Sequence, residues 1–103
     1  MKAVWMGVVA VSAFLSIGAV QADQGLAMSS GCMNCHTVDK KLVGPGFKEI
    51  AAKYKGDSGA AASLAGKVKN GTKGTWGPIP MPPNANVSDE NIKILVKWIL
   101  SLK

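Results

Sequence analysis

The sequence predicts an all-α domain over residues 23–103. Apolar residues recur at the three- and four-residue spacing of a helix face in three separate segments, and no run alternates with the two-residue period of a strand. Glycine and proline, which interrupt helices, cluster between these segments. The chain shows no internal repeat, so a single domain of four to five short helices is expected.

The first two helices are expected on either side of a turn that contains glycine and proline. Residues 23–30 are predicted to form a short first helix, with Asp23 as its cap. The turn at residues 43–46 precedes a second helix over residues 47–54, in which lysine and glutamate lie opposite an apolar face. That face consists of Phe47, Ile50, Ala51 and Tyr54.

Two further helices enclose a segment that cannot be regular. Residues 59–69 are alanine-rich, and Asn70 and Gly71 after them are typical of a left-handed C-terminal cap. Residues 72–87 contain four prolines, which exclude a helix there. The last helix is predicted to begin after a Ser88 cap, with two acidic residues in its first turn. Its apolar stripe consists of Ile92, Leu95, Val96, Ile99 and Leu100.

Residues 1–22 are predicted to be a signal peptide rather than part of the domain. Lys2 supplies a basic start, an apolar stretch follows, and residues 20–22 present small side chains before the polar Asp23. Cleavage after Ala22 would release 81 of the 103 residues into the periplasm without a membrane segment. The apolar stretch is nearly long enough to span a bilayer, so an uncleaved N-terminal anchor is the alternative.

The charge of the predicted domain comes from lysine alone. Without Lys2, eleven lysines stand against six acidic residues, and the chain contains no arginine. Proteins that bind nucleic acids favour arginine for phosphates and bases, so no nucleic-acid partner is expected. Lysines suit a transient, salt-sensitive contact with the acidic docking face of a partner protein. The alternative is that the lysines only form a solvated basic surface, and this is expected for at least some of the lysines.

Cys32-Met33-Asn34-Cys35-His36 is a CxxCH motif, the attachment signature of a c-type haem. Its spacing lets both thiols bond to the vinyl groups of one porphyrin, while His36 supplies an axial nitrogen to the iron. A redox-active dithiol is one alternative, but it is expected in a βαβ context that the flanks lack. A zinc site is another, but it needs more ligands than two cysteines and a single histidine. One covalently attached haem c per chain is therefore predicted.

The second axial ligand is predicted to be Met81. It lies in Trp76-Gly77-Pro78-Ile79-Pro80-Met81-Pro82-Pro83-Asn84, where prolines restrict φ and make a stiff loop that can hold a thioether against the iron. Met28, in the first helix, and Met33, inside the CxxC loop, are poorly placed to reach across the ring. The alternative for Met81 is the more common role of core filler.

These motifs together resemble a known family. From about Gly25 to Lys103, the chain resembles the small bacterial class I cytochromes c of the c-551 type. The resemblance implies the class I fold, in which the helices surround one covalently bound haem. CxxCH marks any c-type haem, whereas the proline-rich segment is more specific. The matching residues are the CxxCH motif, Val43-Gly44-Pro45, Lys69-Asn70-Gly71, Trp76 to Asn84, and Lys97-Trp98.

The resemblance also implies roles for four residues around the haem. The carbonyl of Pro45 would accept the outer N–H of the axial histidine, and Trp76 would donate to a propionate. Asn84 would donate from its amide to the axial sulfur, and Lys67 would approach a propionate, although lysine matches a carboxylate less well than arginine. Each also has an ordinary alternative as a turn, core or surface residue. Residues 84–88 are one residue longer than the family pattern, so a different entry to the last helix is expected.

The expected function is electron transfer and not enzymatic catalysis. An iron that keeps His36 and Met81 in both oxidation states has no open position for a substrate, so a monomeric periplasmic electron carrier is predicted. The resemblance implies donation to a respiratory enzyme, such as the nitrite reductase of denitrification, with an oxidase or a cytochrome c peroxidase as other partners. The alternative is a haem enzyme or gas-binding protein in which Met81 is labile.

Overall fold

The computed structural model describes residues 23–103, and the predicted signal peptide lies outside these residues. The described part of the chain contains a first helix over residues 23–29, one 3-10 turn and three further α-helices. The only strand-like features among these residues are two isolated bridges, so the all-α prediction is confirmed. In chain order, the labelled elements are η1 (Cys32–Asn34), α2 (Phe47–Lys53), α3 (Ala60–Asn70) and α4 (Asp89–Ser101).

Helix α4 begins at the serine cap that the sequence predicts. Ser88 Oγ accepts a hydrogen bond from the Asn91 N–H at 3.1 Å, and two acidic residues lie in the first turn, near the positive end of the helix dipole. The predicted apolar stripe is buried except for Leu100, which is half-buried. Trp98 is buried as well, so the buried face of α4 is wider than the stripe alone predicts.

Helices α2 and α3 both pack against α4. At the start of α2, Glu49 Oε1 accepts a hydrogen bond from the Gly46 N–H at 3.2 Å. At the end of α3, the Gly71 N–H donates to the carbonyl of Lys67 at 2.8 Å. Gly71 has the positive φ expected of a glycine cap, 82°, but its ψ of 172° is extended rather than left-handed helical. The chain therefore leaves α3 in an extended direction.

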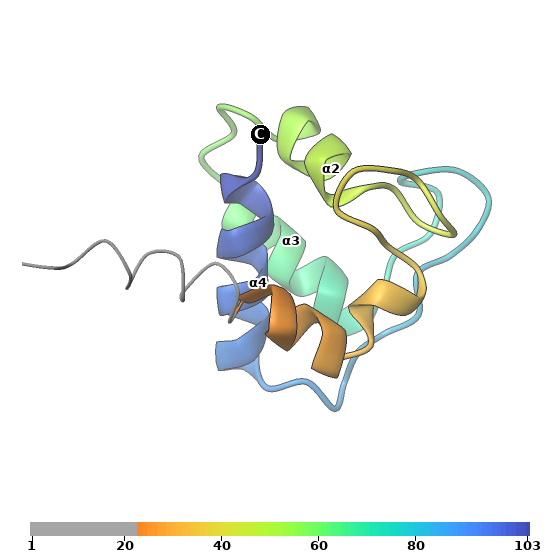
Figure 1. The fold of residues 1–103 in the computed structure, drawn as a ribbon, viewed down its shortest axis with the longest axis vertical. Coiled ribbons are helices and arrows are strands. Elements are labelled where there is room, and N and C mark those ends of the chain that lie inside the picture. Colours follow the sequence, from red (N-terminus) through yellow and green to blue (C-terminus); the bar gives the residue numbers. More distant parts are fainter. Residues whose placement is uncertain (1–22) are drawn as a thin grey trace, which may run out of the picture.

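The core lies where the first helix meets the other three. Ala27 of the first helix is fully buried and belongs to one cluster with the apolar faces of α2, α3 and α4. In Figure 1, α4 lies at the left, residues 36–46 and the first part of residues 71–87 lie at the right, and the rest of residues 71–87 runs along the bottom to the start of α4. These segments carry most of the predicted site residues. None of the helices in residues 23–103 is long and apolar enough to cross a bilayer.

Candidate functional site

The predicted site residues gather around one apolar cavity. Cys32, Cys35 and His36 line it from the CxxCH motif, and Met81 lines it from the proline-rich segment. Apolar side chains of α2, α3 and α4 complete the wall. The empty space, counted out to the open mouth, is about 1150 Å³.

His36 is held by its outer ring nitrogen. Nδ1 lies 2.7 Å from the carbonyl oxygen of Pro45. Because a carbonyl can only accept, Nδ1 carries a hydrogen, and in the neutral ring the lone pair is then on Nε2. The ring is buried and stacks on Phe47, with 5.0 Å between ring centroids. The hydrogen bond that the family resemblance implies is thus present, and it leaves the other nitrogen free to bind a metal.

Gly44 lets the chain pass directly against the imidazole. A Cβ at this position would lie 2.7 Å from Cε1 of His36, which is closer than real Cβ atoms approach. The N–H groups of Val43 and Gly44 donate to the carbonyl of Cys35 at 3.1 and 2.7 Å and fold the turn back onto the CxxCH motif. Sequence reasoning predicted this turn without assigning Gly44 a role. The Gly-Pro pair was the available signal.

The turn η1 brings both thiols of the motif to the cavity wall. The N–H groups of Cys35 and His36 both donate to the carbonyl of Cys32, at 3.2 and 3.0 Å. The two cysteines form no disulfide with each other, and both are half-buried. Burial raises the pKa of the Cys32 thiol, whereas redox-active CxxC motifs work with a lowered thiol pKa. This environment does not favour the dithiol alternative.

The residues around the motif do not support the alternative of a zinc site. Within residues 23–103, no group of three or more His, Cys, Asp or Glu side chains is arranged to hold a metal ion. A structural zinc site needs four such ligands in tetrahedral geometry. Cys32, Cys35 and His36 therefore lack the set that zinc requires in this part of the chain.

Met81 is fixed through its backbone. Its N–H donates to the carbonyl of Thr72 at 2.8 Å, and the Thr72 N–H donates back at 3.0 Å. Gly71, beside this bridge, has a φ of 82°, and a Cβ there would lie 2.5 Å from the carbonyl oxygen of Met81. The close approach therefore requires glycine. Met28, by contrast, is 64% exposed, and neither it nor Met33 lines the cavity.

Trp76 and Lys67 line the same cavity, from the irregular segment and from α3. The Lys67 ammonium donates to the hydroxyl of Tyr54 at 3.2 Å. The Lys53 ammonium lies 5.2 Å from the centroid of the Trp76 ring. Sequence reasoning placed Tyr54 only on an apolar helix face and did not anticipate Lys53. Both contacts join residues that are far apart in the chain, so no local sequence pattern predicts them.

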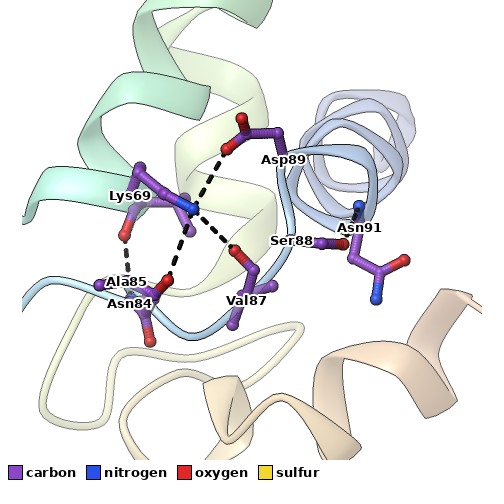
Figure 2. A network of polar contacts seen from close by, with 8 residues as sticks. Lys69, Asn84, Ala85, Val87, Ser88, Asp89 and Asn91 are labelled. Carbon is purple, nitrogen blue, oxygen red and sulfur yellow. Dashed lines mark hydrogen bonds and ion pairs between the residues drawn. The ribbon is translucent and has the colours of Figure 1, made fainter.

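Asn84 lies beside the end of α3, where its side chain and its backbone both donate hydrogen bonds. It does not line the cavity with the other seven predicted site residues. Its amide nitrogen donates to two backbone carbonyls, of Val68 at 3.1 Å and Pro82 at 3.4 Å, and its N–H donates to Val68 at 3.1 Å and Lys69 at 3.2 Å. The side-chain amide of Asn84 is thus hydrogen-bonded to backbone carbonyls. Figure 2 shows Asn84 below the last turn of α3.

The residues around the cavity fit a c-type haem. Two neighbouring thiols can form the thioether bonds, and an imidazole nitrogen and a thioether, which His36 and Met81 bring to this cavity, are groups that can ligate haem iron. The wall between them is mostly apolar, as the faces of a porphyrin require. Lys67 and Trp76 add polar groups that suit propionates. No competing metal or cofactor is needed to account for this set.

Comparisons with known proteins agree with this geometry. The family model described as cytochrome c matches residues 22–103. The chain is 54% identical over 103 residues to cytochrome c-552 of Nitrosomonas europaea, covering all of both chains. It is 48% identical over 99 residues to cytochrome c-551 of Pseudomonas aeruginosa, covering 95% of this chain and 94% of that protein.

A solved structure shares the fold as well. The crystal structure of wild-type Nitrosomonas europaea cytochrome c552 superposes with a TM-score of 0.76 and 55% identity, over 78% of this chain and 99% of that chain. Family model, relatives and structure match over the part that holds the CxxCH motif and Met81. The chain therefore belongs to the cytochrome c family, as a small class I cytochrome of the c-551 type that carries one covalently attached haem c and transfers electrons rather than catalysing a reaction.

Proposed function

We propose that this cytochrome is a periplasmic electron carrier whose haem is attached to Cys32 and Cys35 and ligated by His36 and Met81 in both oxidation states. One observation supports this most directly. One apolar cavity is lined by both thiols, by a buried imidazole whose Nδ1 is bonded to Pro45, and by a methionine whose backbone N–H and carbonyl are both bonded to Thr72. When bound, the haem supplies an iron that alternates between Fe(III) and Fe(II).

The protein's own contribution is to hold the two ligands still. The Pro45 carbonyl orients the imidazole of His36 and raises its basicity, and Gly44 and Phe47 confine the ring from two sides. The backbone bridge between Thr72 and Met81 holds the Met81 backbone in place. Ligands that stay in place between the two oxidation states keep the structural rearrangement that accompanies each electron transfer small.

Lys67 and Trp76 are proposed to hold the haem propionates. Lys67 has two ammonium hydrogens left after its bond to Tyr54, and the Trp76 indole N–H is a donor beside the same cavity. For Asn84 we propose a structural role in place of the implied bond to sulfur. It satisfies the carbonyl of Val68 in the last turn of α3 and so joins that helix to the segment after Met81.

The periplasmic location is proposed from the N-terminal sequence. Residues 1–22 have the charge, apolar stretch and small residues of a cleaved signal peptide. Edman sequencing of the protein purified from cells should begin at Asp23. A protein that begins at Met1 and sediments with membranes would instead indicate the N-terminal anchor.

The partner is proposed to be a respiratory enzyme with an acidic docking face, such as a nitrite reductase, an oxidase or a cytochrome c peroxidase. This rests on the lysine-only basic charge of the domain and on the resemblance to c-551 cytochromes. Electron transfer to such an enzyme should slow as the ionic strength rises. A rate that does not depend on salt would contradict docking through charge.

The visible spectrum of the purified protein tests the ligand set. We expect a six-coordinate, low-spin haem in both oxidation states and, in the ferric protein, the weak far-red band of an iron–sulfur bond. The ferrous protein should not bind carbon monoxide rapidly at neutral pH, because Met81 occupies the sixth position. Rapid binding would favour a haem enzyme or gas-binding protein.

The covalent attachment can be tested separately. Haem stain should stay with the wild-type band in denaturing electrophoresis, and the Cys32→Ala,Cys35→Ala double variant should lose it. Met28→Ala, which alters an exposed side chain outside the cavity, is the matched control and should stain fully. Full staining of the double variant would refute attachment at these cysteines.

A further inference from the structure

We propose that Lys69 is a positioning residue for Met81. Its ammonium ties the segment after Met81 to the ends of α3 and α4, and so keeps the thioether at the ligand position. The proposal rests on the ligation by Met81 proposed for this cytochrome, and it assigns a task to a residue that does not line the haem cavity.

The Lys69 ammonium is surrounded by three acceptors (Figure 2). Nζ lies 3.1 Å from the carbonyl oxygen of Val87, 3.2 Å from Asp89 Oδ1 and 3.5 Å from the carbonyl oxygen of Ala85. An ammonium has three hydrogens, so the set of acceptors matches its capacity. Val87 is buried in the core cluster, so its carbonyl needs a partner at the edge of the core.

The segment after Met81 has few donors of its own. Pro82 and Pro83 have no N–H group, so Asn84 is the first residue after Met81 that can donate from its backbone. Its N–H is directed at the carbonyls of Val68 and Lys69 in the last turn of α3. Lys69 therefore contacts this segment twice, by accepting with its carbonyl and by donating with its side chain.

Met81 lies between two anchor points. On one side, its backbone bridges to Thr72, just beyond the end of α3. On the other side, Lys69 holds the carbonyls of Ala85 and Val87. Without the second anchor, the chain between Met81 and the start of α4 would depend on Asn84 alone for its hydrogen bonds to α3. A neutral thioether is a weak ligand for ferric iron, so its occupancy depends on how firmly the protein positions it.

The carbonyl contacts are the larger part of the Lys69 anchor. Asp89 is 79% exposed, and an ion pair with so exposed a carboxylate adds little stability. A charged hydrogen bond to a carbonyl at the edge of the core is stronger. Removing the ammonium should therefore loosen Met81, whereas neutralising Asp89 should not.

The experiment uses the ferric haem protein and imidazole as a competitor for the sixth position. Lys69→Met keeps a long side chain but removes the donors. We expect this variant to bind imidazole about tenfold more tightly than wild type does, and to lose the far-red sulfur band as imidazole displaces Met81. Lys69→Arg, which keeps charge and donors, should stay within about twofold of wild type. Asp89→Asn, and Lys97→Met at an exposed position of α4, should also stay within about twofold.

Hydrogen exchange gives a second readout that does not depend on haem chemistry. In Lys69→Met, the Asn84 amide should exchange about tenfold faster, whereas the Leu95 amide within α4 should not change. The proposal would be overturned if Lys69→Met bound imidazole as wild type does and its Asn84 amide exchanged at the wild-type rate. Equal effects of Lys97→Met would overturn it as well. If Lys69→Met does not yield folded haem protein, Lys69→Gln is judged by the same criteria.

Failure of this proposal can be distinguished from failure of the proposed ligation. If Met81 is not the ligand, the wild-type protein itself lacks the far-red band, and imidazole binds without displacing sulfur. If Met81 is the ligand and Lys69 has no part in positioning it, the wild-type spectrum is as expected and Lys69→Met matches it.

Discussion

The two ring nitrogens of His36 have different roles, and the hydrogen bond to the Pro45 carbonyl decides which nitrogen has which role. The hydrogen bond to Pro45 uses Nδ1, so Nε2 is the nitrogen directed to metal binding. The CxxCH motif alone predicts that the histidine is a ligand. Only the folded turn shows which nitrogen is occupied and what confines the ring.

Gly44→Ala should disturb this arrangement more than any other glycine change near His36. The new Cβ would lie 2.7 Å from Cε1 of His36, so the ring must shift and its bond to Pro45 must lengthen. We expect the free energy of unfolding of the ferric protein to fall by about 1–3 kcal/mol, as measured by denaturant titration.

Gly66→Ala is the matched control for Gly44→Ala. Gly66 lies within α3, and a Cβ there meets nothing within 4 Å, so the same change should raise stability by up to about 1 kcal/mol. A Gly44→Ala protein as stable as Gly66→Ala would show that the contact with His36 is not tight in solution.

Met81→Ala should remove the proposed sixth ligand without removing the haem. The ferric protein should lose the far-red band and become high-spin or water-ligated, and the reduction potential should fall by on the order of 100 mV, because the thioether favours the ferrous state. Spectropotentiometry measures both effects. An unchanged far-red band would contradict the ligand assignment. Met28→Ala, at a 64% exposed position, should match wild type.

Among the elements, α4 is the one whose start is most fully specified by local sequence. Ser88 caps it, two acidic residues follow, and the predicted stripe faces the core. The proline-rich segment before it is different. Its prolines predict stiffness, but its position depends on hydrogen bonds to other parts of the chain. Thr72, just beyond α3, bonds to Met81; Asn84, within the segment, bonds to the last turn of α3; and Lys69 of α3 bonds to the carbonyl of Val87.

Ser88→Ala should shorten or fray the first turn of α4. The hydroxyl accepts the Asn91 N–H at 3.1 Å, and this donor would lose its protein partner. We expect a loss of about 1 kcal/mol in the free energy of unfolding, with the far-UV spectrum nearly unchanged. Ser63→Ala, at an exposed position within α3, should be neutral or slightly stabilising. Equal effects of the two changes would show that the cap contributes nothing.

For the whole molecule, the core and the haem cavity share their walls. Leu95, Val96 and Ile99 of α4 belong to the buried cluster and also line the cavity. A domain of about eighty residues buries too little apolar surface to spare these contacts. The bound haem is therefore part of the hydrophobic core as well as the functional group.

Lys41→Glu should test the electrostatic role of the cavity mouth. Lys41 is exposed and lines the cavity, so a charge reversal there acts where an anionic oxidant approaches. We expect the second-order rate of oxidation by hexacyanoferrate(III) to fall about two- to fivefold at low ionic strength, and the difference to disappear at high salt.

Lys103→Glu makes the same change in net charge at the exposed C-terminus, away from the residues that line the cavity. Its effect on the oxidation rate should be clearly smaller than that of Lys41→Glu. Identical rates for the two variants would mean that net charge, and not a local docking face, controls the reaction.

The sequence by itself determined the chemistry and the helices of this cytochrome. The CxxCH spacing, the prolines around Met81 and the apolar periodicity of α4 are local patterns, and their consequences follow from bonds and angles within a few residues. Only the tertiary structure decided which polar groups meet. Asn84 donates to the carbonyl of Val68, Lys69 joins α3 to the start of α4, and Lys67 donates to Tyr54. These contacts join residues brought together by packing, so no single stretch of sequence specifies them.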